Sequence, residues 1–155
     1  SFLIASPNET ISLQIKSFDL SDRCQVVTGQ THKVLLEADL AIITSGTATL
    51  EAAILETPHV LVYRTSGLTY LMSKLFLKTK YVGLVNILAD KFVSSELIQK
   101  ACTAQEIVSE VNDLLNNDSK RSHMIEEFRN IYKTLGSNNS SNTVADRLLE
   151  ATYSN

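Results

Sequence analysis

The fold is decided by the stretch at residues 38–64, ADLAIITSGTATLEAAILETPHVLVYR. An apolar run at 40–43 and a turn of small residues at 44–47 precede a helical pattern that ends near Glu56, and a second apolar run follows at 60–63. A helix that connects two buried strands is normally a right-handed crossover between parallel strands. The apolar runs do not alternate with polar residues, which indicates strands covered on both faces. The stretch therefore predicts a parallel α/β sheet.

The turn between the first strand and the helix is the candidate binding site. In open parallel sheets, ligands bind beyond the carboxyl ends of the strands, and Ser45, Gly46 and Thr47 lie at such an end. The N–H groups and the positive dipole end of the next helix suit an anion, and Gly46 lets a phosphate approach the backbone. Glu51, about one turn further along, can accept hydrogen bonds from a sugar diol. The spacing supports equally a structural alternative, in which Ser45 and Thr47 only cap the helix.

The composition is that of one ordinary globular domain. The chain has 155 residues, 44% hydrophobic and 20% charged, which is enough to bury a core. A formal net charge of −3 gives no indication of nucleic-acid binding. Cys24 and Cys102 lack metal-ligand spacing, and we expect buried thiols in a reducing compartment. His32, His59 and His123 also lack metal-ligand spacing, and we expect them at the surface or packed, and not as metal ligands.

Outside the central stretch, local patterns predict further elements. Before the central stretch we expect a strand at 1–6, a helix at 9–18, a strand at 24–27 and a helix at 31–38. After it we expect a helix at 68–78, a strand or extended loop at 81–88 and a short helix opened by Ser94 and Ser95. The last three are a helix from the capping box at 103–106 to about Leu115, a helix from its cap Asp118 to near Leu135 with Gly136 as C-cap, and a helix at 143–153. We expect a Rossmann-like unit of four to five strands at 1–101, followed by C-terminal helices at 102–155.

The sequence predicts no membrane-spanning segment but contains a basic, apolar stretch. No apolar run reaches the roughly 18 residues needed to cross a bilayer, and we recognise no signal peptide. However, no acidic residue occurs at 57–89, whereas Arg64, Lys74, Lys78 and Lys80 lie there. Basic residues on an apolar helix are typical of a membrane-surface segment. A core-facing helix with solvated lysines is the alternative, and it is the more common one.

Four blocks of sequence point to a family: ADLAIITSGTATLEA at 38–52, PHVLVYR at 58–64, KTKYVGLVNILA at 78–89 and ELIQ at 96–99. In order and spacing they resemble the C-terminal half of lipid-A-disaccharide synthases. The resemblance implies a two-domain glycosyltransferase of the GT-B type. It would transfer an acylated glucosamine from a UDP donor to a monosaccharide-phosphate lipid acceptor in lipid A biosynthesis. The C-terminal domain would hold the donor.

The resemblance also implies a set of donor-binding residues. Ser45, Gly46 and Thr47 would face the donor diphosphate, and Glu51 would face the ribose hydroxyls. Asn86, in the Leu-x-Asn-Ile block, would face the cleft.

Five further positions in the blocks have open or unassigned roles. Arg64 follows the family's Tyr-Arg pair, and a donor contact and a structural ion pair are equally supported for it. Glu96 and Gln99 match the family without an assigned role. Gly83 and Val85 replace the more usual Ser and Pro, which affects the shape of the Asn86 loop.

Parts of such an enzyme are missing from these residues. The N-terminal domain, with the acceptor site and the expected catalytic base, is not present, nor is the Gly-Ser-Arg loop that opens the donor domain. The sequence also enters a strand directly without an initiating Met, so we expect a fragment that is inactive alone. We expect no metal or cofactor, because the helix dipole and side-chain donors would stabilise the departing UDP.

The expected partners are the UDP-sugar donor, the lipid acceptor, the membrane surface and a second copy in a homodimer, with no nucleic acid. The expected location is cytoplasmic, peripheral on the inner membrane. The C-terminal helices would contact another domain or subunit and leave apolar positions such as Phe128 and Ile131 exposed in the isolated domain. Two alternatives stay open: the donor domain of another GT-B enzyme or a UDP-sugar epimerase, and a non-catalytic nucleotide-binding module.

Overall fold

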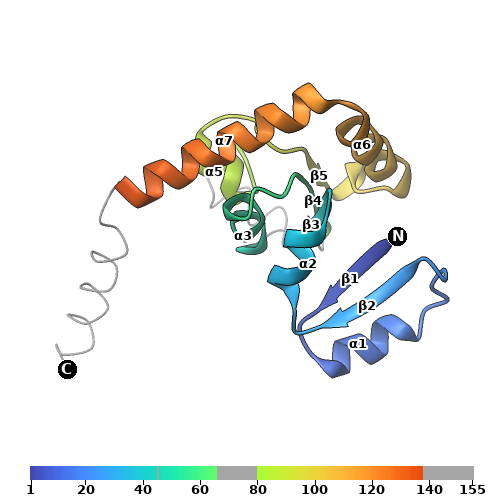
Figure 1. Cartoon of the computed structure of the whole chain (residues 1–155). Helices are drawn as coiled ribbons and strands as arrows, with labels where there is room; N and C mark the ends of the chain where they lie inside the picture. Colours follow the sequence, from blue (N-terminus) through green and yellow to red (C-terminus); the bar gives the residue numbers. More distant parts are fainter. Residues whose placement is uncertain (45, 66–79, 138–155) are drawn as a thin grey trace, which may run out of the picture.

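The computed structural model describes residues 1–44, 46–65 and 80–137, and its elements are labelled in Figure 1. They are β1 (Phe2–Ser6), α1 (Glu9–Lys16), β2 (Cys24–Thr28), α2 (Thr31–Glu37), β3 (Ala41–Thr44), α3 (Ala48–Ile54), β4 (His59–Tyr63), α5 (Leu84–Ala89), β5 (Glu96–Ile98), the 3-10 turn η1 (Gln99–Ala101), α6 (Ala104–Asn116) and α7 (Asp118–Ser137).

All strand pairs in the described part of the chain are parallel, which confirms the predicted α/β fold. The strands are divided between two sheets, however: β1 pairs with β2, and β3, β4 and β5 form a second sheet in that order. Helices α1, α2 and α3 connect the successive strands. In Figure 1 the β1–β2 pair and α1 lie apart from the three-stranded sheet, with α2 between them.

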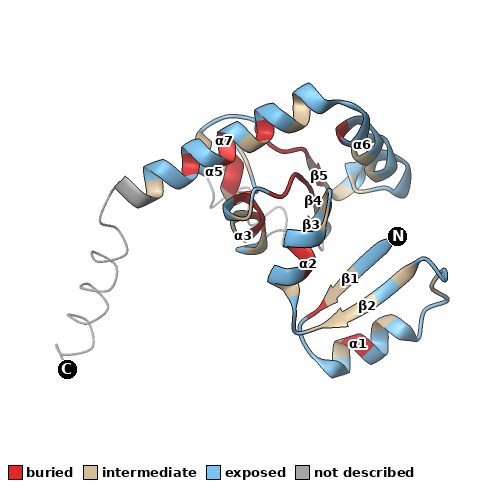
Figure 2. Ribbon diagram, viewed as in Figure 1, coloured by how far each residue is buried: buried red, intermediate tan, exposed pale blue. Residues whose placement is uncertain are grey.

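The main core lies between the three-stranded sheet and the helices α3, α5, α6 and α7. Val60 and Leu61, successive residues of β4, both have no exposed surface, as expected for a central strand covered on both faces. Helix α7 contributes Met124, Phe128 and Ile131 to this core. Figure 2 shows the buried residues gathered where the helices meet this sheet, whereas β1, β2 and α1 are mostly intermediate or exposed.

This packing corrects one expectation. Phe128 and Ile131 are only 1% and 5% exposed, because α7 packs its apolar face onto the sheet domain itself. They are therefore not left open for another domain or subunit.

Two elements between β4 and α6 were predicted wrongly. The segment expected to be a strand or loop forms helix α5. The short helix expected from Ser94 onward is strand β5 at Glu96–Ile98, and helical structure begins only at Gln99, in η1. Both differences have tertiary causes. The Leu61 N–H of β4 donates to the carbonyl of Ser95 at 2.9 Å, so backbone pairing with β4 holds this segment in the sheet. The carboxylate of Glu96 then accepts the N–H groups of Val82 and Gly83, the two residues that precede α5.

The capping box at the start of α6 is confirmed at its first residue: Thr103 Oγ1 accepts the Glu106 N–H at 3.2 Å. The cap of α7 is not Asp118. Asn117 Oδ1 accepts the Lys120 N–H at 3.0 Å, one residue earlier than predicted. Helix α7 also continues through Gly136 to Ser137, so Gly136 is not its C-cap.

The predicted helices at 68–78 and 143–153 lie outside the described residues, as does Ser45. Among the helices that the structure does describe, none combines the length and the apolar character needed to cross a membrane.

Candidate functional site

Three neighbouring strands end at one edge of the sheet and bring the candidate residues together. The register pairs Thr44 of β3 with Val62 of β4, so Gly46 and Arg64 each lie two residues beyond a matched pair. Tyr63 pairs with Ile98, the last residue of β5, so Arg64 and Gln99 each directly follow this pair. In parallel sheets this carboxyl edge is where ligands bind.

The turn after β3 has a backbone conformation that favours glycine. Gly46 has a φ of 140°, which residues with a Cβ rarely adopt. A Cβ built there would meet no described atom within 4 Å, so the space beside this backbone is open. The buried Thr49 fixes the turn from below, because its Oγ1 donates to the Gly46 carbonyl at 2.9 Å. The result is an exposed, well-held piece of backbone that a ligand can approach.

Thr47 does not support the capping alternative. It occupies the N-cap position of α3, but its side chain makes no capping hydrogen bond, and the residue is exposed. Its hydroxyl is therefore available to a ligand. The corresponding question for Ser45 falls outside the described residues. Because α3 has only seven residues, the dipole of this helix is a weaker argument for an anion site than the sequence suggested.

Glu51 lies on α3 and contacts a residue that the sequence analysis had assigned no role. Its Oε2 lies 3.2 Å from Nε2 of His32, which comes from the first turn of α2. The Glu51 side chain is 39% exposed and that of His32 is 73% exposed. The contact joins α2, which follows β2, to α3, which follows β3. A signal for His32 existed, since a glycine with a φ of 68°, Gly29, connects β2 to α2 and repeats the strand–glycine–helix pattern.

Arg64 is exposed immediately after β4. Within the described ranges no carboxylate forms an ion pair with it, so the structural alternative for Arg64 gains no support there. The next residue is held firmly: the Thr65 N–H donates to Oε1 of Gln99 at 3.2 Å.

Asn86 is placed elsewhere, away from the edge formed by Gly46, Arg64 and Gln99. It has no exposed surface, and its amide is fully used inside the chain. Its Oδ1 accepts the N–H groups of Val93 and Ser94 at 2.8 and 2.9 Å, and its Nδ2 donates to the Ser94 carbonyl and to Glu96 Oε1, both at 2.8 Å. In this structure Asn86 therefore orders the turn between α5 and β5.

Glu96 links Asn86, within α5, to Gly83, which directly precedes that helix. Its Oε1 also accepts the Gly83 N–H at 2.9 Å. A Cβ on Gly83 would lie 3.0 Å from Leu61 Cδ1 and 3.2 Å from Glu96 Oε1, so the glycine allows this close approach. The departure from the family's usual residue at this position thus has a local packing consequence.

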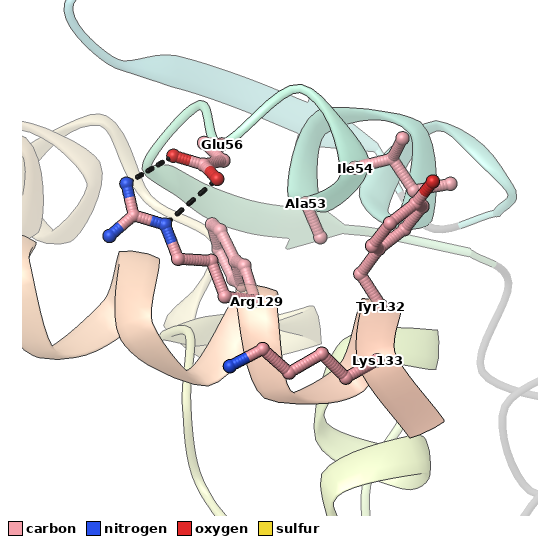
Figure 3. A pocket seen from close by; sticks show the side chains of 7 residues that line it. Ala53, Ile54, Glu56, Arg129, Tyr132 and Lys133 are labelled. Atoms are coloured by element: carbon pink, nitrogen blue, oxygen red, sulfur yellow. Dashed lines mark hydrogen bonds and ion pairs between the residues drawn. The ribbon is translucent and has the colours of Figure 1, made fainter. Parts of the chain in front are cut away.

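A separate hollow of about 200 Å³ lies between α3 and α7 (Figure 3). The lining residues are Ala53, Ile54, Glu56, Phe128, Arg129, Tyr132 and Lys133. At its rim Arg129 donates two hydrogen bonds to Glu56, at 2.8 and 2.6 Å, and this contact holds the pKa of Glu56 below its usual range. The hollow lies at the C-terminal end of α3, whereas Gly46 and Thr47 precede its N-terminal end. It contains none of the predicted site residues.

Comparison with known families identifies the family of the chain that carries this edge. The model of the lipid-A-disaccharide synthetase family matches residues 1–148. The chain belongs to this family. The prediction of the family from the four sequence blocks is thereby confirmed, and the alternatives of another GT-B enzyme or a UDP-sugar epimerase are set aside.

Individual relatives agree with the family match. A lipid-A-disaccharide synthase of Syntrophus aciditrophicus is 38% identical over 112 residues, which are 72% of this chain and 29% of the relative. Those of Psychromonas ingrahamii and Chromobacterium violaceum are 39% and 36% identical, over 72% and 82% of this chain. The chain spans 29% to 32% of the length of these lipid-A-disaccharide synthases.

Among the described residues, no group of three or more His, Cys, Asp or Glu side chains is arranged to hold a metal ion. The groups available to a ligand here are the open backbone of Gly46, the exposed hydroxyl of Thr47, the guanidinium of Arg64 and the carboxylate of Glu51.

Proposed function

We propose that this chain is the donor-binding part of a lipid-A-disaccharide synthase. The whole enzyme would be a hexosyltransferase that moves an acylated glucosamine from a UDP donor to a monosaccharide-phosphate lipid acceptor. The observation that carries the proposal is the meeting of Gly46, Thr47 and Arg64 at the carboxyl edge of the β3–β4–β5 sheet, in a member of this family.

The diphosphate of the donor would lie on the turn at Ser45, Gly46 and Thr47. The open backbone at Gly46 admits the phosphate oxygens, the Thr47 hydroxyl donates to them, and the exposed Arg64 supplies a positive charge. These groups stabilise the negative charge that develops on the departing UDP, so the proposed mechanism needs no metal. The base that activates the acceptor hydroxyl would come from outside these 155 residues.

The ribose would be held by Glu51. Only Oε2 of this carboxylate contacts His32, and Oε1 has no hydrogen-bond partner within the described ranges. An ionised carboxylate accepts hydrogen bonds from a vicinal diol, and His32 would fix its orientation. We leave Asn86 out of the donor contacts in this proposal, because its buried amide is fully bonded inside the chain.

The two sheets suggest how residues 1–101 form one donor domain. In the doubly wound order, the chain runs outward on both sides of a central first strand. One sheet here has the order β2–β1 and the other has β3–β4–β5, so a single strand between β1 and β3 would complete that order. The free edges carry exposed apolar residues, with Phe2 61% and Ile42 51% exposed. We propose that a strand of the longer polypeptide pairs with both edges. The topological switch point would then lie between that strand and β3, next to Gly46.

The remaining partners belong to the proposal as well. The acceptor would be a lipid, and the enzyme would work in the cytoplasm at the inner membrane surface, where exposed basic residues such as Lys80 favour anionic lipid. A second copy in a homodimer stays part of the proposal, although α7 does not leave its apolar face open for that purpose.

Calorimetric titration of UDP into the full-length polypeptide tests the donor site. Glu51→Gln should weaken UDP binding about tenfold or more, since a hydrogen bond to a charged group contributes about 1.5–3 kcal/mol. Gly46→Val should cost more affinity than Ser45→Ala, because it adds bulk and backbone strain where the diphosphate approaches. Glu37→Gln is the matched control, an exposed carboxylate at the far end of α2. Unchanged UDP affinity in both Glu51→Gln and Gly46→Val would refute the proposal.

A further inference from the structure

Gln99, which directly follows β5 and begins η1, combines two unusual features. Its φ is 53°, a left-handed conformation that is uncommon for a residue with a Cβ and costs free energy. Its side chain reaches back to the neighbouring strand, where Oε1 accepts the Thr65 N–H at 3.2 Å. Strained backbone that the surrounding structure maintains is found preferentially at functional sites.

The hydrogen bond from Thr65 fixes the peptide that follows Arg64. Arg64 has no ion-pair partner within the described ranges, so no described carboxylate restrains its guanidinium. The position of the Arg64 Cα, from which its side chain extends, is therefore set by the backbone on either side. On one side this is the β4 ladder, through Tyr63, and on the other it is the Gln99 contact.

Gln99 is not needed to hold the sheet together. The pairing of β4 with β5 already covers Leu61 to Tyr63, and Glu96 and Asn86 fix the turn before it. The Gln99 bond is a single, half-buried contact beyond the end of the ladder. Its loss should change the direction of the chain at Arg64 far more than the stability of the fold.

We propose that Gln99 is a positioning residue for the nucleotide site. By holding Thr65 it directs Arg64 across the end of β3 toward the open turn at Gly46, where the guanidinium meets the diphosphate of a nucleoside diphosphate. The proposal rests on the proposed donor site and adds to it the residue that orients its cation.

The test is a double-mutant cycle measured by calorimetric titration of UDP into the full-length polypeptide. Arg64→Ala should weaken UDP binding about tenfold to a hundredfold, as expected for a charge-assisted bond to phosphate. Gln99→Ala should weaken it about fivefold to tenfold, because the cation is misdirected and not removed. In the Arg64→Ala background, Gln99→Ala should have less than about a twofold further effect, since it acts through Arg64.

Two further variants separate positioning from a role in folding. Gln99→Gly removes the same side chain but relieves the left-handed strain, so it should melt at or above the wild-type temperature and still bind UDP as weakly as Gln99→Ala. Lys100→Ala, an exposed neighbour in η1, is the matched control and should leave UDP affinity unchanged.

The proposal is overturned if the losses from Gln99→Ala and Arg64→Ala multiply in the double variant, or if Gln99→Gly binds UDP like the wild type. Its failure differs from failure of the donor site. If Gly46→Val and Glu51→Gln abolish UDP binding while Gln99→Ala has no effect, the site stands and the role of Gln99 falls. If none of these variants changes UDP affinity, both proposals fall.

Discussion

Replacing His59 by Phe should remove much of this protein's sensitivity to mild acid. His59 begins β4 and has no exposed surface. Its Nδ1 lies 3.2 Å from the Thr57 carbonyl, and its ring stacks on Phe128 of α7, with 5.3 Å between the ring centroids. No described partner satisfies its buried Nε2. Protonation of Nε2 would therefore place an uncompensated charge in the core.

The magnitude follows from the pKa of this imidazole. Burial lowers the pKa of His59 from 6.5 to about 4, while the Thr57 carbonyl opposes the change only in part. Between these two values the unfolded chain binds a proton that the folded chain does not, so stability falls as the pH falls from 6.5 toward 4. The full difference corresponds to about 3 kcal/mol, at 1.36 kcal/mol for each pKa unit.

The assay is urea unfolding of the wild type and of His59→Phe at several pH values between 7 and 4. Between pH 7 and pH 4, the wild type should lose unfolding free energy relative to His59→Phe. This relative loss should approach about 3 kcal/mol at pH 4. The exposed His123→Phe serves as the control and should follow the wild-type profile. If the difference in unfolding free energy between wild type and His59→Phe is the same at pH 7 and pH 4, the reasoning is wrong.

Three further predictions concern the framework of the site. Asn86→Ala leaves three buried backbone groups without partners and should cost about 3–5 kcal/mol in urea unfolding. Phe128→Ala should cost about 3–5 kcal/mol through the cavity it creates beneath α7, whereas Tyr132→Ala, one turn along on the exposed side, should cost far less. Arg129→Ala should lower the melting temperature only slightly, in a salt-sensitive manner, and NMR titration should show the pKa of Glu56 returning upward to its usual value.

The central unit of the fold could be predicted because its signals are local. The apolar runs that became β3 and β4, and the turn around Gly46, are determined by residues adjacent in sequence. The same is true of Thr103, whose hydroxyl caps α6 as the sequence predicted. Four sequence blocks with the right order and spacing were enough to identify the family.

The region between β4 and α6 could not be predicted, because distant contacts decide it. Pairing with β4 makes Glu96–Ile98 a strand, and the Leu61 N–H of β4 bonds to the carbonyl of Ser95 just before it. Glu96 in turn holds the residue before α5, Gly83, from 13 residues away. The contact between Gln99 and Thr65 spans 34 residues. Likewise, Gly29 marks the turn before His32, but the local sequence does not show that His32 of α2 contacts Glu51 of α3.

The most direct test of the account is a crystal structure of the full-length polypeptide with bound UDP. We predict diphosphate oxygens within hydrogen-bonding distance of the backbone at Gly46 and Thr47, the Arg64 guanidinium on the same diphosphate, and the ribose hydroxyls on Glu51. Electron density for UDP elsewhere, for example in the hollow between α3 and α7 with the β3 turn left empty, would contradict it.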